Sequence, residues 1–306
     1  MKKFILAGIL SLATIGSVNA QSLMGTGGED GTYYQMGSDI GQYCEMTKPQ
    51  VSGGSVDNIE SMIRKKMQVG FVQHDVLALY KDFVNPTKVN KKRFKIVAVL
   101  HDEPINILIP YGWQPVTNEK KSFWSRFGFG KDDAPKAIDL NLLKNQQVGA
   151  WGGSRFTAQA LSKYAGLNLS VTEVSKNDVS GAMPVVVVAG APSDVVQKFL
   201  DSGKYQLINV DYSKITGRAT EYYYSHQVNY NVKGRILKVD TIATKAVLAG
   251  RNLRSNSEEL TKLAECIQEN MENLSEDSDS NTNWEDVMDW NSDEDNFVDW
   301  SYFVQQ

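Results

Sequence analysis

The chain has 306 residues, a formal net charge of −4 and only two cysteines. This length allows two domains, or one large domain, with a substantial apolar core. The slightly acidic balance gives no support to nucleic-acid binding. Two cysteines and three scattered histidines (His74, His101 and His226) provide no set of zinc ligands.

Residues 1–20, MKKFILAGILSLATIGSVNA, combine two lysines with an apolar middle and small side chains before a cut. Val18 and Ala20 occupy the small-residue positions, so we expect a secretory signal peptide cleaved between Ala20 and Gln21. The apolar part is too short for a good membrane anchor. We therefore expect a soluble, exported, periplasmic protein that does not insert into the membrane after cleavage.

From residue 21 to about 240, short apolar strands alternate with amphipathic helices. The predicted strands are residues 21–24, 69–72, 94–100 and 105–109, and then 147–150, 169–174, 184–189 and 205–210. The predicted helices include residues 36–44, 56–66, 156–164, 193–200 and, near the end, 257–271. This alternation is typical of α/β units around mainly parallel sheets, and the two sets of strands predict two sheets.

Two segments do not fit this alternation. TNEKKSFWSRFGFGKDDAPKA, residues 117–137, is either a surface loop or a docking surface for a membrane partner, since Lys and Arg beside Phe and Trp suit an interface. Residues 272–306 hold eleven acidic residues, no Lys or Arg, and three tryptophans. Their acidity predicts a solvated tail, whereas the tryptophans predict that part of it packs on the body.

Three glycine turns share one local pattern: GTGGEDGTYY at 25–34, SGGS at 52–55 and WGGS at 151–154. Each ends a predicted strand and opens a predicted helix, where free N–H groups and the helix dipole favour an anion. Neither a P-loop lysine nor the dinucleotide fingerprint is present. Ser55 and Ser154 can also be simple helix caps. Three such turns, two in the first half and one in the second, favour a site between two lobes.

Four stretches resemble one family, the TAXI-type solute receptors of tripartite ATP-independent periplasmic (TRAP) transporters. They are GTGGEDGTYYQMGSDIG, VSGGSVDNIESMIRKKMQVGFVQHDVL, VGAWGGSRFTAQAL and VVVVAGAPSDVVQKF. The resemblance covers roughly residues 21–270. It implies an α/β type II periplasmic-binding-protein fold, in which two lobes joined by a hinge close over a ligand.

The signal-peptide pattern and the acidic composition after residue 271 mark off the two ends of the chain, and the resemblance implies the division between them. We expect residues 1–20 to be the signal peptide and lobe I to be residues 21–110, with 235–271 returning to it. Lobe II is residues 111–234 with the 117–137 insertion, and 272–306 is the acidic C-terminal tail.

The resemblance places the ligand-binding residues at the glycine turns and at one strand end: Thr32, Tyr33, Ser55, Gln73, Ser154 and Thr157. Arg155 is added from its own chemistry, because a guanidinium at a helix start can hold a carboxylate with two hydrogen bonds. The alternatives are that Arg155 is an exposed surface arginine and that Tyr33 is a core aromatic residue. A tyrosine of EYYYSH (221–226) either lies over the cleft or belongs to a buried strand.

The family implies a small anionic organic solute, namely a small carboxylate or amino acid that is glutamate-like or a dicarboxylate, delivered to TRAP permease subunits. It implies neither a cofactor nor turnover. In this fold Cys44 and Cys266 both belong to lobe I, and we expect a disulfide between them. An enzyme is disfavoured because Ser55, Ser154, His74 and His101 form no recognisable nucleophile motif, and HDE (101–103) is interpreted as a loop. The remaining alternative is a receptor-like module that senses or assembles without transport.

Overall fold

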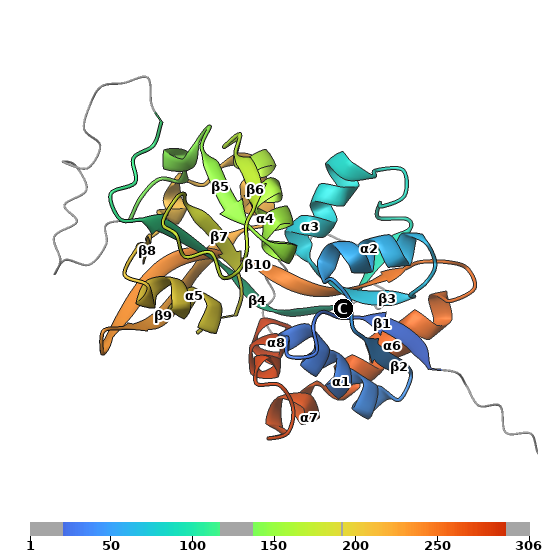
Figure 1. The fold of residues 1–306 in the computed structure, drawn as a ribbon. Helices are drawn as coiled ribbons and strands as arrows, with labels where there is room; N and C mark the ends of the chain where they lie inside the picture. The colour runs from blue at the N-terminus through green and yellow to red at the C-terminus, as the bar shows by residue number, and fades with distance from the viewer. Residues whose placement is uncertain (1–20, 117–136, 191, 292–306) are drawn as a thin grey trace, which may run out of the picture.

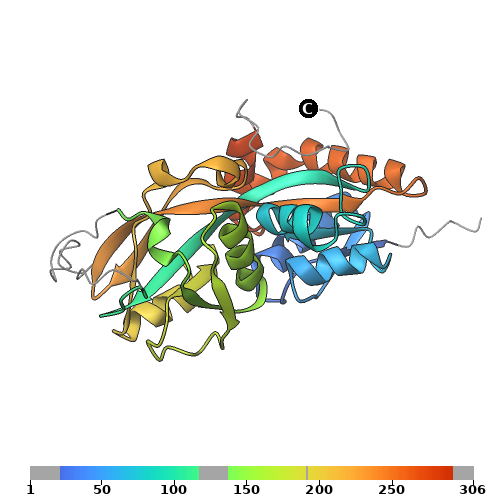
Figure 2. The same cartoon turned by 90° about the horizontal axis from the view of Figure 1, so that it is seen from above.

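The computed structural model describes residues 21–116, 137–190 and 192–291, which form two α/β lobes lying side by side (Figure 1). Two strands of 17 residues each cross between the lobes: β4 (Phe94–Pro110) and β10 (Arg235–Arg251). They pair antiparallel and run along the long axis of the molecule (Figure 2). The predicted signal peptide, nearly all of the 117–137 insertion and the tail after residue 291 lie outside the described residues.

Lobe I contains the sheet order β2-β1-β3-β10-β4. Strand β1 is parallel to β2 and β3, and β10 is antiparallel to β3 and β4. The elements of this lobe before the crossing are β1 (Ser22–Gly25), α1 (Thr32–Cys44), β2 (Thr47–Gln50), α2 (Ser55–Ile63), β3 (Val69–Gln73), α3 (His74–Leu79) and the π-helical turn η1 (Tyr80–Val84).

Lobe II is built on the far halves of the crossing strands. Strand β7 is antiparallel to β4, and β5 is parallel to both β7 and β6. The end of β4 also pairs with β8, and β10 pairs with β9. The elements are η3 (Leu140–Leu143), β5 (Gln147–Ala150), α4 (Gly152–Tyr164), β6 (Ser170–Glu173), β7 (Val185–Val188), α5 (Asp194–Asp201), β8 (Tyr205–Leu207), η4 (Tyr212–Lys214), η5 (Gly217–Glu221) and β9 (Tyr224–Val232).

The described strands form one connected sheet of ten strands, so the prediction of two mainly parallel sheets is wrong. Both sets of strands pair with β4 and β10, which belong to both lobes. Strand β4 is also continuous where two strands, 94–100 and 105–109, are predicted. The HDEP segment (101–104) resembles a turn because polar residues precede a proline. In the structure it stays extended, and Asp102 pairs with Lys245 on the neighbouring strand.

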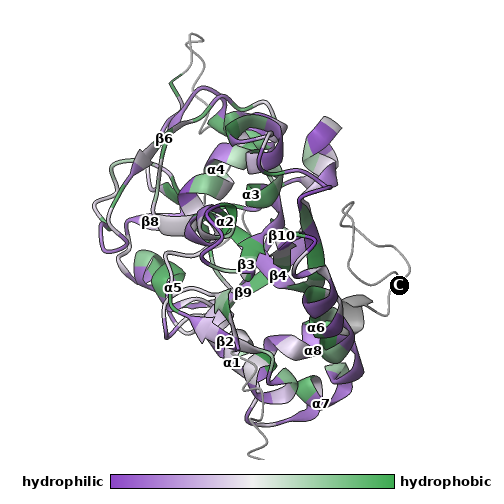
Figure 3. Ribbon diagram, turned by 90° about the vertical axis from the view of Figure 1, so that its right-hand side faces the viewer, coloured by the Kyte–Doolittle hydropathy of each residue, from purple (hydrophilic) through white to green (hydrophobic). Residues whose placement is uncertain are grey.

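The helices lie where apolar side chains recur every three or four residues. In α2, Ile59 and Met62 are fully buried, whereas Asp57 on the opposite face is exposed. Helices α2, α4 and α6 accordingly alternate between green and purple along their length (Figure 3). Burying a side chain the size of Ile59 or Met62 stabilises the fold by roughly 1.5–3 kcal/mol.

The C-terminal part of the described chain packs on lobe I as α6 (Ser257–Glu269), α7 (Met271–Glu276) and α8 (Asn283–Asn291). Cys266 of α6 forms a disulfide with Cys44, the last residue of α1. Trp284 of α8 is completely buried, and its indole Nε1 donates to Asp39 Oδ2 of α1 at 2.9 Å. Of the two interpretations of the acidic tail, packing therefore holds for its described part.

Candidate functional site

A pocket of about 320 Å³ opens between the two lobes at the N-termini of α2 and α4. It is lined from lobe I by Gly53, Val56, Asp57, Glu60 and Arg64, and from lobe II by Gly152, Gly153, Arg155, Phe156 and Glu173. Neither helix start is capped by a side chain. The free N–H groups of two helices are thus available beside a pocket with ionic and apolar walls.

Two glycines allow the backbone to form the starts of α2 and α4 beside the pocket. Gly54, which precedes α2, has φ +87°, a conformation that other residues rarely adopt. Gly153 at the start of α4 lies against lobe I, because a Cβ atom there would be 3.3 Å from Gln73 Oε1. The glycine turns therefore bring the two lobes into contact.

Behind the pocket, Ser55, Gln73 and Glu103 form a buried hydrogen-bonded chain. The Ser55 hydroxyl accepts from the Gln73 backbone N–H at 3.1 Å and donates to Gln73 Oε1 at 3.3 Å. Gln73 Nε2 donates to Glu103 Oε2 at 2.6 Å. Burial raises the pKa of the Glu103 carboxyl, although the hydrogen bond from Gln73 and the nearby Tyr33 hydroxyl oppose the rise.

Tyr33 extends this chain toward α1. Its ring stacks on Phe71 with the centroids 5.1 Å apart and meets the edge of His101 at 5.9 Å. Its buried hydroxyl lies near Glu103 and Ser55 without a well-aligned hydrogen bond to either. Burial, followed by the charge of Glu103, raises the pKa of Tyr33 well above its usual value. The ring of Tyr33 therefore packs against the apolar core, and its hydroxyl lies beside the buried polar chain.

Asp75 joins the two lobes directly. It is completely buried, and it accepts hydrogen bonds from Tyr223 at 3.1 Å and from Thr157 at 3.5 Å. Both donors belong to lobe II, whereas Asp75 belongs to α3 in lobe I. Burial raises the pKa of the Asp75 carboxyl to about 7, against the lowering effect of these hydrogen bonds. Asp75 is consequently a group that changes charge near neutral pH.

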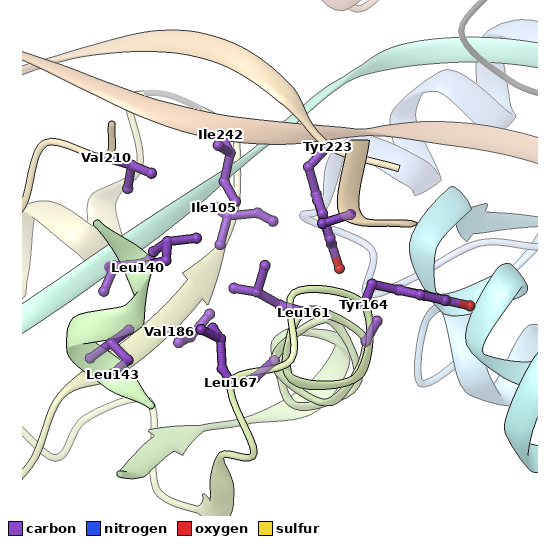
Figure 4. Close-up of a cluster of buried hydrophobic side chains, with 14 of the residues drawn as sticks. Ile105, Leu140, Leu143, Leu161, Tyr164, Leu167, Val186, Val210, Tyr223 and Ile242 are labelled. Carbon is purple, nitrogen blue, oxygen red and sulfur yellow. The ribbon is translucent and has the colours of Figure 1, made fainter. Parts of the chain in front are cut away.

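A second connection between the lobes lies at Asp82 in η1. Its Oδ2 accepts from the Tyr164 hydroxyl at 2.9 Å and from the Arg218 guanidinium at 2.6 Å. Figure 4 shows Tyr164 reaching from α4 toward the helical segment of lobe I, with Tyr223 above it. The apolar side chains of Ala78 and Leu79 pack into the same cluster. The lobes are therefore in a closed arrangement.

The remaining predicted residues have separate positions. Thr32 begins α1 and is half-buried. Ser154 is buried, and its hydroxyl accepts from the Val188 backbone N–H at 2.9 Å. Arg155 forms an ion pair with Glu173 at the pocket wall. Of the predicted set, Tyr33, Ser55, Gln73 and Thr157 thus reach the buried network, Arg155 reaches the pocket, and Ser154 holds β7.

The sequence analysis missed the carboxylates of this region, above all Asp75 and Glu103. Asp75 could have been predicted, because it lies in VQHD (72–75), near the end of the second quoted stretch and just after β3. Glu103 was hidden by the interpretation of residues 101–103 as a loop, which is wrong because they lie inside β4. Tyr223 of EYYYSH is buried just before β9, and its hydroxyl enters the junction between the lobes.

Another cluster of ionisable groups surrounds Asp102, which His226, Lys245 and Tyr224 contact from β9 and β10. Burial alone would raise the pKa of Asp102, but hydrogen bonds from His226 and Lys245 and the charge of Lys245 hold it well below its usual value. Burial lowers the pKa of Lys245 in spite of this pairing. The cluster ties β9 to the crossing strands.

Two searches of the described residues gave negative findings. None of the helices described is long and apolar enough to cross a bilayer. In the same part of the chain, no three His, Cys, Asp or Glu side chains are grouped as metal ligands would be.

Comparisons with known proteins give one family. A family model described as the NMT1-like family matches residues 24–287. No curated protein matches the sequence. The order of strands in lobe I and the two crossing strands are those of a type II periplasmic-binding-protein fold, so the predicted fold class is confirmed.

Several solved structures are similar at low sequence identity. A protein from Bordetella bronchiseptica RB50 is 11% identical over 87% of this chain and 77% of its own, with a TM-score of 0.48. A histidine kinase sensor domain, described as similar to periplasmic binding proteins, is 10% identical over 88% and 94%, with a TM-score of 0.47. The GluR0 ligand-binding core from Nostoc punctiforme, in complex with L-glutamate, is 13% identical over 88% and 97%, with a TM-score of 0.45.

Proposed function

Because this chain belongs to the NMT1-like family and has a periplasmic-binding-protein-like fold, we propose that it is a periplasmic solute receptor without catalytic turnover or a cofactor. One observation carries the proposal, namely the pocket that helix starts from both lobes build together. A solute there contacts α2 of lobe I and α4 of lobe II at once. Its binding energy therefore favours the closed arrangement over an open one.

The charges of the pocket define the solute further. Its walls carry three carboxylates, Asp57, Glu60 and Glu173, and two guanidinium groups, Arg64 and Arg155. Each guanidinium is paired with a carboxylate of the pocket, Arg64 with Glu60 and Arg155 with Glu173. A dicarboxylate must break these pairs and then meets an excess of negative charge. A zwitterion can place its carboxylate at Arg155 and the α4 N–H groups, and its ammonium group at Glu173 or Asp57. Among the predicted solutes, we therefore propose an amino acid.

The delivery step rests on the resemblance described above rather than on the pocket. We propose that the exported, mature protein carries its solute to the membrane subunits of a TRAP-type permease. The proposed site residues are those of the pocket and of the network behind it, including Tyr33, Ser55, Gln73 and Thr157. Thr32 and Ser154 remain proposals as residues at the helix starts.

The first experiment is a melting assay of the mature protein with a panel of amino acids, dicarboxylates and 2-oxo acids. A solute at one hundred times its Kd stabilises the folded state by about 2.7 kcal/mol, which is a shift of several degrees for a chain of this length. We expect amino acids to raise the melting temperature and dicarboxylates to leave it unchanged.

Two substitutions in lobe II test the site. Arg155→Ala removes a pocket wall, and we expect the apparent Kd of the responding amino acid to rise at least about tenfold. Lys176→Ala removes an exposed cation of the same lobe, outside the pocket, and is expected to leave the Kd unchanged. Equal effects of both variants on the Kd would show that the solute does not bind in this pocket.

The interlobe contacts favour a second candidate function. Asp75, Asp82 and the apolar side chains around Leu79 already hold the lobes together with protein contacts alone. A receptor-like module for sensing or assembly, uncoupled from transport, would use such a fixed closed form. A panel without any responder, and no solute released when the purified protein is denatured, would favour this candidate.

A further inference from the structure

The far end of lobe I carries a group of positive side chains that plays no part in the proposed solute site, apart from Arg64 at its border. Three segments contribute to it: the end of α2, the approach to β4, and the turn after β10. We call it the basic face and define it as Arg64, Lys65, Lys66, Lys91, Lys92, Arg93, Arg251 and Arg254. All of these are exposed except Arg251, which is half-buried.

Hydrogen bonds to backbone carbonyl groups hold the three segments together. The Arg251 N–H donates to Gln68 O at 3.0 Å, and its guanidinium donates to Met62 O at 3.0 Å. The Asn252 N–H donates to Arg93 O at 2.8 Å. Burial and the charge of Arg93 lower the pKa of Arg251, as expected for cations that lie close together. The basic face is therefore a fixed surface built from distant parts of the sequence.

The segments that carry this face contain no acidic residue: residues 61–70, 86–101 and 249–257 lack Asp and Glu altogether. The carboxylates at the border are already engaged, Glu60 with Arg64 and Glu258 with Lys262. The chain as a whole is negatively charged, at −4. A group of cations without interspersed carboxylates thus lies at one end of an acidic protein.

The face also lacks an apolar centre. The exposed large apolar side chains of the described chain are Leu23, Val51, Phe83, Val84, Tyr111, Val116 and Ile236, and all lie outside these three segments. Interfaces between proteins usually have an apolar centre and few lysines. Clusters of lysine and arginine without such a centre suit anionic lipid headgroups, which attract them by charge alone.

We propose that the basic face docks the protein onto the surface of an anionic bilayer. The lobe rests on the headgroups through Lys66, Lys92 and Arg93, and no side chain enters the hydrocarbon. The pocket between the lobes remains open to solute, so this docking is independent of which solute the protein binds. It concentrates the receptor at the membrane and is reversed by salt.

The experiment is co-sedimentation of the mature full-length protein with vesicles of phosphatidylcholine alone, or of an equal mixture of phosphatidylcholine and phosphatidylglycerol. We expect binding to the mixed vesicles only, and its loss in about 1 M NaCl, where charges are screened beyond about 3 Å. Each cation at the surface contributes a factor of about five to the partition coefficient. The triple variant Lys66→Glu, Lys92→Glu, Arg93→Glu should therefore lower it at least about tenfold.

The matched control is Lys176→Glu, Lys204→Glu, Lys214→Glu, which changes the net charge equally on exposed residues of lobe II. We expect it to bind the mixed vesicles nearly as the unmodified protein does. Melting curves with the responding amino acid show that both variants are folded and that the solute site is intact. Equal losses in the two triple variants, equal binding to both kinds of vesicle, or no binding at low salt would each overturn the proposal.

Discussion

Two buried carboxyl groups distinguish the junction between the lobes from an ordinary apolar interface. Asp75 and Glu103 each accept hydrogen bonds from neutral donors, and no described cation pairs with Asp75. Burying a carboxylate without a cation is costly, so both groups are protonated more readily than in water. The charge at this junction consequently depends on pH.

Asp75→Asn tests this dependence. The pKa of Asp75 is about 7 in the folded protein against 3.8 for an unperturbed aspartate. Since the folded state holds the proton more tightly, its stabilising effect is complete below pH 3.8 and is lost as the pH rises through about 7. The unfolding free energy should fall over this range by up to about 4 kcal/mol because of this group. The asparagine variant should lack this fall, which urea denaturation at several pH values measures.

The control for this prediction is Asp178→Asn, because Asp178 is exposed on lobe II. It should leave the difference in stability between acidic and neutral pH unchanged. A parallel pH dependence in the unmodified protein and in Asp75→Asn would show that Asp75 is ionised in the folded protein throughout the range.

At the scale of elements, the sequence predicts helices better than it predicts the strands that join the lobes. The predicted helix 257–271 is matched by α6, because its apolar residues recur with a helical period and one face is buried. Strand β4 was divided because its polar HDEP segment is satisfied by side chains from β3, β9 and β10. No local pattern reveals partners that are distant in the sequence, so both the continuous strand and the role of Glu103 went unpredicted.

Helix α8 illustrates the same limit, since its sequence is acidic and gives no clear amphipathic pattern. Its anchor is Trp284, which is buried and hydrogen-bonded to α1, whereas the sequence left open only whether part of the tail packs on the body. We predict that Trp284→Phe lowers the unfolding free energy by about 2–4 kcal/mol, through a smaller ring and the loss of the hydrogen bond to Asp39. Trp113→Phe, at a half-buried position, is the control and should cost less than about 1.5 kcal/mol. Unchanged stability in the Trp284 variant would mean that α8 does not pack on α1 in solution.

At the scale of the whole molecule, the glycine turns and the family motifs predicted the two-lobed fold and the helix starts at which the pocket lies. They did not predict the closed arrangement. Closure depends on pairs such as Asp82 with Arg218, which are 136 residues apart in the sequence. Neither residue belongs to a motif, and a lone charged residue normally indicates only a solvated surface.

Asp82→Ala tests whether these contacts set the balance between closed and open forms. The substitution removes the acceptor shared by Tyr164 and Arg218, and a partly exposed pair of this kind contributes about 1 kcal/mol, or a factor of about five in the ratio of forms. We expect a larger radius of gyration in small-angle X-ray scattering. Glu221→Gln is the control, because Glu221 also pairs with Arg218 but lies in the same lobe.

If a solute binds between the lobes, saturating amounts should restore the compact form of Asp82→Ala, since the solute contributes the interlobe contacts that the variant lacks. An open variant that the solute fails to close would place the solute on one lobe alone.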